Sequence, residues 1–215
     1  MSAAVITYDE GMSRWEPNAR ERLSRAAMEL YRERGFDQTT AAETAERAGL
    51  TERTFFRYFA DKREVLFSGQ ERLVETYVTS IAAAPAAATP MDMVAAAVGS
   101  VAPFFEEHRD FSRQRQAIVA AHPELQEREL LKRAAMAGAV AGALRQRGVT
   151  EPAASLAAEA GVIAFKTAYS RWVSDPGGPG LAQLIEETFS QFHTLTGPTP
   201  TAARPATVTA TAGRR

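Results

Sequence analysis

Apolar residues recur at helical spacing through most of the chain, whereas the alternation typical of strands is scarce. In the first such segment, residues 18–34, Leu23, Ala27 and Leu30 follow the spacing of one buried helix face. The same criterion predicts further helices at 41–48, after Thr51, and at 61–81, 91–107, 110–121, 124–147, 151–174 and 181–195. The pattern therefore predicts an all-α protein of about nine helices.

Polar residues predict where three of these helices begin. Capping-box pairs, in which a polar residue is followed three positions later by Glu, occur at 18–21, 40–43 and 61–64. Gly35 is expected to end the first helix, and the Ala/Pro-rich residues 82–89 read as a loop closed by Pro90. Three helix starts so close together predict a compact helical module at residues 17–64.

The composition excludes several kinds of protein. The 215 residues include no cysteine, which excludes disulfide frameworks, thiolate zinc sites and cysteine nucleophiles and fits a reducing cytosol. Residues 1–16 have no apolar run and are expected to be a flexible arm rather than a signal peptide. Residues 197–215 are mostly Thr, Ala and Pro and are expected to be a disordered tail. No window is apolar enough for a membrane span, so a cytoplasmic protein is expected.

The stretch TAAETAERAGLTERTFFRYFADK, residues 40–62, carries the clearest motif. Ala45 is small enough for two helices to approach closely, and Gly49, four residues later, can supply the positive φ of a tight turn. Leu50 and Phe55 then stand where the second helix must be anchored to the first. This arrangement is typical of a helix-turn-helix, whose second helix enters the major groove of DNA.

The second helix is expected to present a polar outer face. Phe55 and Phe59 fall on one side of it, whereas Arg53, Phe56 and Arg57 fall on the other. Arginine can bond guanine through two hydrogen bonds, and an aromatic ring can pack on thymine methyl groups, so this face is suited to base edges. A solvated, Arg-rich surface helix is the alternative interpretation.

The charge distribution helps to distinguish a DNA-binding helix from a solvated surface helix. The whole chain has 25 basic and 26 acidic residues, which argues against a uniformly basic surface that coats nucleic acid. Residues 53–63, however, hold four basic residues and one acidic residue, so their net charge is +3 and the remainder sums to −4. Lys62 and Arg63 in this segment are candidates for phosphate contacts. Positive charge is therefore concentrated on the predicted DNA-binding segment.

Two functions other than DNA binding, an enzyme and a ligand-binding protein, find less support in the sequence. The three histidines, His108, His122 and His193, lie far apart in the sequence, and no metalloprotease, P-loop or dinucleotide-binding motif is present. Adjacent carboxylates such as Glu106 and Glu107 project in different directions from a helix and do not converge. An enzyme is therefore not expected. A helical ligand-binding protein without a DNA-binding role stays as the alternative, although the basic segment argues against it.

Residues 23–66 closely resemble the N-terminal domain of TetR-family transcriptional repressors. The matching pieces are AA-x-x-LY in the first helix, GF followed by TT, TAERAGL, TFFRYF and DKREVL. The resemblance covers about 45 of the 215 residues, and the rest matches in architecture and length. It implies a helix-turn-helix DNA-binding domain at 17–64 and an effector-binding and dimerisation domain at 65–196.

The resemblance also implies which residues contact DNA. These positions are Thr40, Thr51, Glu52, Arg53, Thr54, Phe56, Arg57, Tyr58 and Lys62. Thr40, Tyr58 and Lys62 match positions that commonly bind phosphate. Phe56 departs from the family, which usually has Tyr there, and Thr44 stands where an aliphatic residue normally packs.

The family's regulatory domain usually binds a small molecule between its helices and dimerises through its last two helices. The apolar stripe of the last helix, which suits either a dimer interface or internal packing, comprises Leu181, Leu184, Ile185, Thr188, Phe189 and Phe192. Candidate effector-binding residues are Phe104, Phe105, Phe111, Arg113, Gln116, His122, Met136, Tyr169 and Trp172. Each of these also suits ordinary core or surface.

The sequence as a whole predicts a ligand-responsive regulator without a cofactor or metal. We expect a homodimer that represses by binding a pseudo-palindromic operator, because a single helix-turn-helix reads too few base pairs for specificity. The segment TERTFFRYFADKREVLF is similar to regulators associated with acyl-type hydrophobic effectors, so a small hydrophobic molecule is expected to release the DNA.

Overall fold

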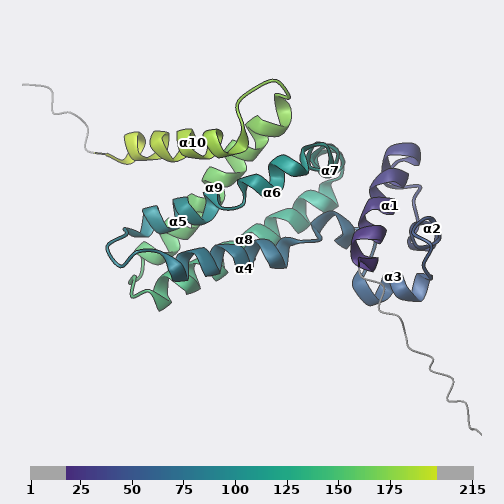
Figure 1. Ribbon diagram of the computed structural model, residues 1–215, viewed down its shortest axis with the longest axis horizontal. Helices are drawn as coiled ribbons and strands as arrows, with labels where there is room; N and C mark the ends of the chain where they lie inside the picture. Colours follow the sequence, from purple (N-terminus) through teal and green to yellow (C-terminus); the bar gives the residue numbers. More distant parts are fainter. Residues whose placement is uncertain (1–17, 198–215) are drawn as a thin grey trace, which may run out of the picture.

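The computed structural model describes residues 18–197, and within them every regular element is helical (Figure 1). The predicted N-terminal arm, and the predicted tail beyond Gly197, lie outside the described residues. The elements in chain order are α1 (Ala19–Arg34), α2 (Ala41–Arg47), α3 (Glu52–Tyr58), the 3-10 helix η1 (Glu64–Phe67), α4 (Gln70–Ala83), α5 (Pro90–Gly99), α6 (Ala102–Glu107), α7 (Arg109–Ala121), α8 (Pro123–Gln146), α9 (Ala153–Ser174) and α10 (Leu181–Thr196). The predicted all-α class is confirmed.

Helices α1, α2 and α3 form a small body at one end of the molecule (Figure 1). Its core is apolar and includes Leu23 and Ala27 of α1, Ala45 of α2 and Phe55 of α3, all at most 1 % exposed. The same core is completed by residues of the following domain, among them Leu125 of α8. The small N-terminal body is therefore packed directly against α7 and α8.

The remaining helices form an elongated second body. Helix α4 runs beside α8, and α9 packs against α5, α8 and α10 (Figure 1). Small residues of α9, among them Ala157, Ala164 and Ala168, are buried at these contacts, and at Gly161 a Cβ atom would lie 2.3 Å from the Cγ1 of Val94 in α5. Glycine at this position thus permits the close approach of the two helices. Among the described residues, no helix is both long and apolar enough to cross a membrane.

Three sequence predictions about helix boundaries need correction. The predicted capping box at 18–21 does not form, because Asn18 has a φ of 82° and its side chain makes no capping hydrogen bond. The predicted helix 61–81 is divided: η1 is separated from α4 by Gly69, whose φ of 91° is incompatible with a continuous α-helix. The predicted helix 91–107 is divided into α5 and α6, since Pro103 has no N–H for the carbonyl of Gly99.

Candidate DNA-binding surface and effector cavity

The turn between α2 and α3 is held by local hydrogen bonds. Thr40 and Glu43 form the predicted capping box, with the Thr40 N–H donating to the Glu43 carboxylate at 2.9 Å. Gly49 has a φ of 66°, and the N–H of Leu50 donates to the carbonyl of Ala45 at 2.8 Å. These contacts fix the direction in which α3 leaves the turn, so the helix-turn-helix geometry predicted from the sequence is present.

Helix α3 has one buried and one exposed face. Phe55 and Phe59 are at most 1 % exposed, whereas Phe56 is 52 % exposed, and Arg53 and Arg57 are also exposed. Phe56 packs its ring edge against Phe55, with the ring centroids 5.4 Å apart. An exposed aromatic ring between two arginines is therefore available to the edges of bases.

The other predicted DNA contacts lie around this face. Thr40, Thr51 and Glu52 are exposed at the starts of α2 and α3, and Thr54 and Tyr58 are half-buried. The guanidinium of Arg57 lies 5.0 Å from the centre of the Tyr58 ring. The structure thus brings the predicted residues of α3 and the start of α2 to one end of the molecule; their contact with DNA stays a prediction.

Lys62 has a structural partner within the chain. Its Nζ donates to the carbonyls of Phe36, Asp37 and Thr39 at 2.9, 3.0 and 3.1 Å, and it lies 4.6 Å from the centre of the Phe36 ring. The ammonium group therefore ties the loop between α1 and α2 to the end of the helix-turn-helix. The phosphate contact of Lys62 stays a prediction. To make it, the ammonium group would have to give up its three hydrogen bonds to these carbonyls.

The departure at Thr44 is accommodated without loss of a hydrogen bond. Its side chain is fully buried, and its Oγ1 donates to the carbonyl of Thr40 at 2.9 Å. A buried hydroxyl that is paired in this way carries little energetic cost.

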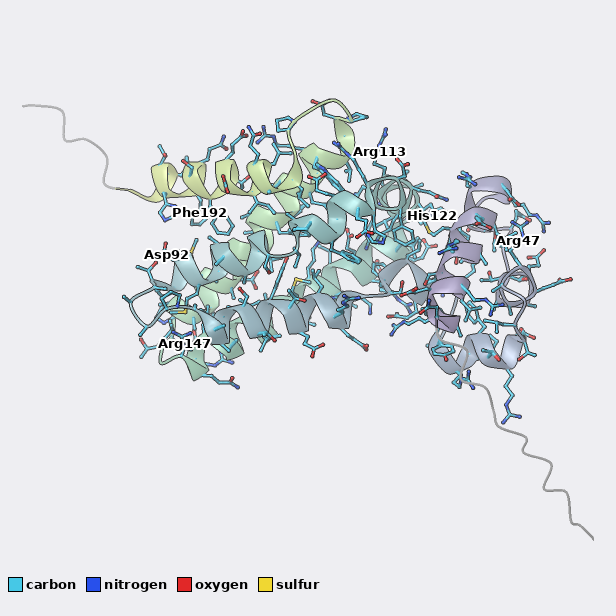
Figure 2. The ribbon with its side chains drawn as sticks, viewed as in Figure 1. Arg47, Asp92, Arg113, His122, Arg147 and Phe192 are labelled. Atoms are coloured by element: carbon cyan, nitrogen blue, oxygen red, sulfur yellow. The ribbon has the colours of Figure 1, made fainter. Side chains whose placement is uncertain are left out.

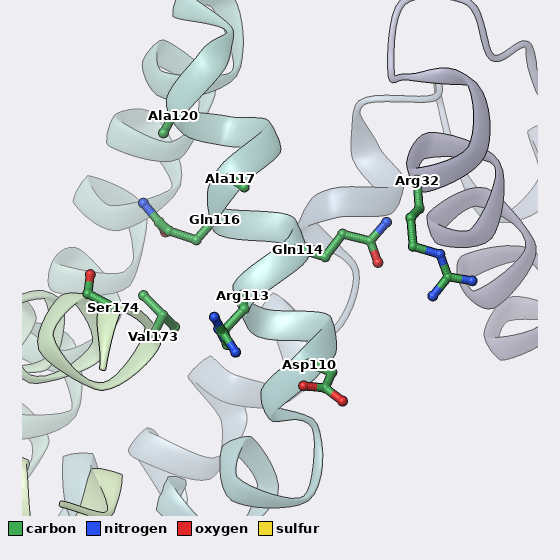
Figure 3. A pocket seen from close by; sticks show the side chains of 9 residues that line it. All are labelled: Arg32, Asp110, Arg113, Gln114, Gln116, Ala117, Ala120, Val173 and Ser174. Atoms are coloured by element: carbon green, nitrogen blue, oxygen red, sulfur yellow. The ribbon is translucent and has the colours of Figure 1, made fainter. Parts of the chain in front are cut away.

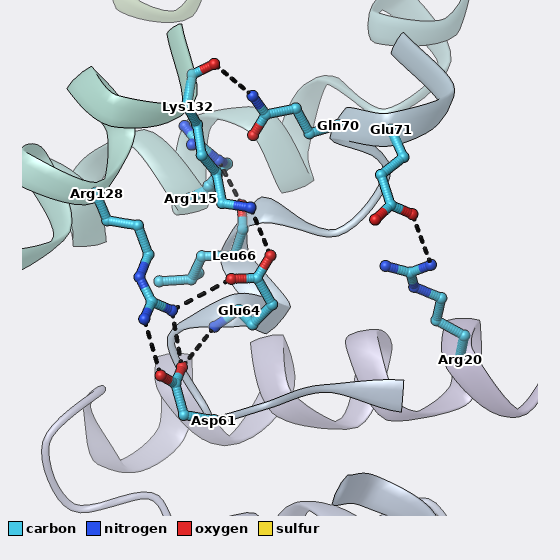
Figure 4. Close-up of polar contacts among 9 residues, drawn as sticks. All are labelled: Arg20, Asp61, Glu64, Leu66, Gln70, Glu71, Arg115, Arg128 and Lys132. Atoms are coloured by element: carbon cyan, nitrogen blue, oxygen red, sulfur yellow. Dashed lines mark hydrogen bonds and ion pairs between the residues drawn. The ribbon is translucent and has the colours of Figure 1, made fainter. Parts of the chain in front are cut away.

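Ion pairs connect the DNA-binding domain to α8 (Figure 4). The guanidinium of Arg128 donates to both oxygens of Asp61 at 2.9 Å and to Glu64 at 3.3 Å. Lys132, one turn further along α8, donates to the other oxygen of Glu64 at 2.6 Å. Burial raises the pKa of Asp61, but the hydrogen bonds from Arg128 and from the Glu64 N–H outweigh it and hold that pKa below its ordinary value.

A second set of contacts reaches the domain from α7. The Nε of Arg115 donates to the carbonyl of Leu66 in η1 at 2.7 Å (Figure 4). Its Nη1 donates to Glu129 at 2.9 Å. Nearby, the Nε2 of His122 lies 3.5 Å from the Asp37 carboxylate, and the rings of His122 and Phe36 meet edge to face with their centroids 4.9 Å apart. Figure 2 shows His122 at the junction of the two bodies. The regulatory domain therefore holds both η1 and the α1–α2 loop.

A cavity of about 1120 Å³ lies between α1, α4 and the helices α6–α9. Its apolar lining includes Phe104, Phe105, Phe111, Met136 and Tyr169, which are five of the nine residues predicted for the effector site. Phe105, Phe165 and Tyr169 form a continuous aromatic cluster, with neighbouring ring centroids 5.3–5.6 Å apart. The cavity is large enough for a drug-sized ligand.

The other four predicted effector residues lie elsewhere. Arg113 and Gln116 line a separate hollow of about 740 Å³ on the outer face of α7 (Figure 3). Trp172 is fully buried, and its indole N–H donates to Glu106. His122 belongs to the domain junction described above. These four residues do not line the cavity between α1 and α9.

Several residues of the cavity were not predicted from the sequence. Phe165 lies one helical turn before Tyr169, and this spacing was a usable signal. Arg115, Lys132 and Arg133 also line the cavity, but in the sequence they look like ordinary solvated charges. Their role depends on which helix faces meet, which the sequence pattern alone does not show.

The apolar stripe of α10 packs mainly inside the chain. Its side chains that are at most 8 % exposed are Leu181, Leu184, Ile185, Thr188 and Phe189. Phe192 is half-buried. Large apolar side chains that are exposed on α9 and α10 are Leu156, Ile163 and Leu195, at 66, 55 and 84 %. The stripe was expected to form either a dimer interface or an internal contact. Internal packing describes the first five of its six residues.

Comparisons with known proteins agree on one family. The family described as "Bacterial regulatory proteins, tetR family" matches residues 23–68, and the "MftR C-terminal domain" matches residues 88–196, just over half of the chain. The transcriptional regulator TcmR of Streptomyces glaucescens is 33 % identical over 82 residues, or 38 % of this chain. That match spans only about a third (36 %) of TcmR.

Solved structures share the fold. FadR of Thermus thermophilus, determined in complex with lauroyl-CoA, has a TM-score of 0.54 at 23 % identity, covering 86 % of this chain and 98 % of that one. FadR of Bacillus halodurans has a TM-score of 0.56 at 19 % identity, covering 83 % and 99 %. The repressor SmeT of Stenotrophomonas maltophilia has a TM-score of 0.54 at 19 % identity, covering 82 % and 89 %. Because the two family models match residues of both domains, the chain belongs to the TetR family of bacterial transcriptional regulators.

Proposed function

We propose that this regulator is a homodimeric repressor whose two α3 helices read a pseudo-palindromic operator, and that a small hydrophobic effector in the cavity releases the DNA. The observation that carries the proposal is the exposed face of α3, where Phe56 stands between Arg53 and Arg57. Such side chains have no role in the core and match the donors and apolar contacts that base edges accept. The protein would act in the cytoplasm, with the chromosome.

Dimerisation is supported by apolar side chains that this chain leaves exposed. Leu156 and Ile163 are seven residues apart and therefore share one face of α9, and Leu195 adds to the exposed apolar area on α10. A two-fold axis through such a surface would bring the same residues of two chains together. It would also place two copies of α3 on one DNA duplex, as operator specificity requires.

An acyl-type effector is supported by the cavity. Its aromatic cluster, formed by Phe105, Phe165 and Tyr169, offers a wall against which an apolar chain can pack. The FadR of Thermus thermophilus, which shares the fold, was determined with lauroyl-CoA. For the present chain we infer a hydrophobic compound of the same kind.

DNA binding is tested with the DNA upstream of the protein's own gene. Gel shifts at moderate salt, with random-sequence DNA as competitor, should show a complex that random DNA displaces poorly. Equal competition by random DNA would contradict the proposal. Transcription in vitro from the same DNA separates a repressor, which lowers the yield of transcript, from an activator, which raises it.

A further inference from the structure

Two cations of the cavity wall also hold the DNA-binding domain. Lys132 donates to Glu64 at 2.6 Å, and Arg115 donates to the carbonyl of Leu66 at 2.7 Å, so both hold the 3-10 helix η1. Both also lie over the ring of Phe67, at 5.7 and 5.0 Å from its centre. Because Lys132 and Arg115 line the cavity, a molecule bound there would meet the same groups that position η1.

We propose that the effector is an amphipathic anion, and that Lys132 and Arg115 sense it. Its anionic head group would compete with Glu64 and with the Leu66 carbonyl for these two cations, and its apolar chain would pack on the aromatic cluster. Binding would thereby free η1 from Lys132 and Arg115 and change the orientation of the DNA-binding domain attached to it. This inference rests on the proposed function, since it identifies the class of effector and the way in which its binding is transmitted.

The charges of the cavity lining favour an anion beside Lys132 and Arg115. Lys132, Arg115 and Arg133 face one acidic residue of the lining, Glu129, which is shared between the two arginines. The part of the lining that comes from α1 and α4 is balanced, with four basic and four acidic residues. The three cationic side chains are only 17–29 % exposed, so an anionic group bound among them would be only weakly screened.

The apolar part of the effector has a surface beside these cations. Tyr169 of the aromatic cluster lines the same cavity as Arg115. Met136, one helical turn after Lys132 on α8, is also part of the cavity lining. A linear chain with a single charged end could therefore occupy the aromatic cluster and reach Lys132 and Arg115 at once.

Arg128 provides a matched control. It binds Asp61 and Glu64 on the same domain, but it is not part of the cavity lining. An effector that displaces Lys132 from Glu64 would leave the Arg128–Asp61 pair in place. Binding would then tilt the DNA-binding domain about this pair rather than detach it.

The experiment uses the full-length protein and four probes that each have a linear chain of ten carbon atoms. Decanoate and decyl phosphate carry anionic heads, decanol is neutral, and decyltrimethylammonium is cationic. Calorimetry without DNA measures the binding of each probe, and fluorescence anisotropy measures operator affinity with and without it. We expect the two anionic probes to weaken operator binding by about 5- to 150-fold, the usual range of allosteric coupling. The ranking of decanoate against decyl phosphate then distinguishes a carboxylate head from a phosphate head.

Variants test the two sensing residues. In Lys132→Met, the anionic probes should bind about tenfold more weakly and lose most of their effect on the operator, whereas Lys132→Arg should retain both. Arg128→Met should bind the probes as the wild type does. The inference is overturned if decanol or decyltrimethylammonium releases the operator as well as the anions do, if no probe binds, or if Lys132→Met keeps the full response. A wild-type protein that fails to select its operator before any probe is added would instead contradict the proposed function.

Discussion

Arg128 of α8 and Asp61 of the DNA-binding domain pair end-on, with Nη1 and Nη2 of the arginine donating two hydrogen bonds of 2.9 Å to the two carboxylate oxygens. Asp61 follows α3 by three residues, and Arg128 lies in the second turn of α8. Two planar groups paired in this way fix orientation as well as distance. The pair therefore helps to set the angle between the predicted recognition helix α3 and the long helix α8, which lines the cavity.

We expect Arg128→Ala to lower the free energy of unfolding by about 1–3 kcal/mol, because it leaves Asp61 and Glu64 without a partly buried cationic partner. Urea denaturation followed by circular dichroism measures the change. Arg145→Ala is the matched control on the same helix, because both partners of its ion pair with Glu151 are exposed and such pairs contribute little to stability. Equal losses in the two variants would show that the contact between domains adds nothing.

The lowered pKa of Asp61 predicts an acid-sensitive contact. Since the folded state holds this pKa below its unfolded value of about 3.9, the carboxylate contributes stability at neutral pH. That contribution is lost as the pH falls from about 4 through the folded pKa. We expect the difference in Tm between the wild type and Asp61→Asn to shrink below about pH 4. A difference that stays constant down to pH 2.5 would contradict the assignment.

The helix-turn-helix was predictable because its signals are local. The capping box at Thr40, the turn at Gly49 and the apolar residue Phe55 each act within a few residues of the chain. The division of the predicted helix 61–81 was missed, since apolar spacing continues on both sides of Gly69. A glycine inside a helical pattern is often tolerated, so the pattern alone does not show its positive φ.

The cavity was predictable only in part, because it depends on which helix faces meet. Apolar residues such as Phe105 and Tyr169 were found from their type and position. Lys132 and Arg115 were missed, since a charged residue on a helix is usually solvated. The stripe that includes Leu184 looks the same whether it packs on the chain's own helices or on a second copy, and only the fold distinguishes the two.

Lys62→Ala tests the structural role of the ammonium group. The substitution leaves the carbonyls of Phe36, Asp37 and Thr39 without their shared donor, and hydrogen bonds to charged groups contribute about 1.5–3 kcal/mol. We therefore expect reduced stability in urea. If stability is unchanged and the salt dependence of operator binding falls by about one ion, Lys62 binds a phosphate instead.

Arg53→Ala tests base contacts by α3. We expect operator affinity to fall by about 1–3 kcal/mol and the preference at one base pair to relax, because an exposed arginine on this face can bond a guanine. Anisotropy titrations against a set of single-base operator variants measure both effects. Arg145→Ala removes an exposed arginine near the end of α8, at the opposite end of that helix from Arg128, and should bind all of these sequences as the wild type does. A uniform loss for every sequence in Arg53→Ala would indicate a phosphate contact.

Ile163→Glu tests the proposed dimer surface on α9. The side chain is 55 % exposed in the single chain, so the substitution should leave the fold intact while placing a charge in the interface. Sedimentation velocity should show a shift from dimer to monomer, with a parallel loss of operator binding, since one α3 alone reads too few base pairs. Leu131→Glu is the control, because Leu131 is 72 % exposed on α8, outside the proposed surface, and should stay dimeric. If Ile163→Glu also stays dimeric, the two chains meet through another face, and the apolar residues of α9 must be exposed for a different reason.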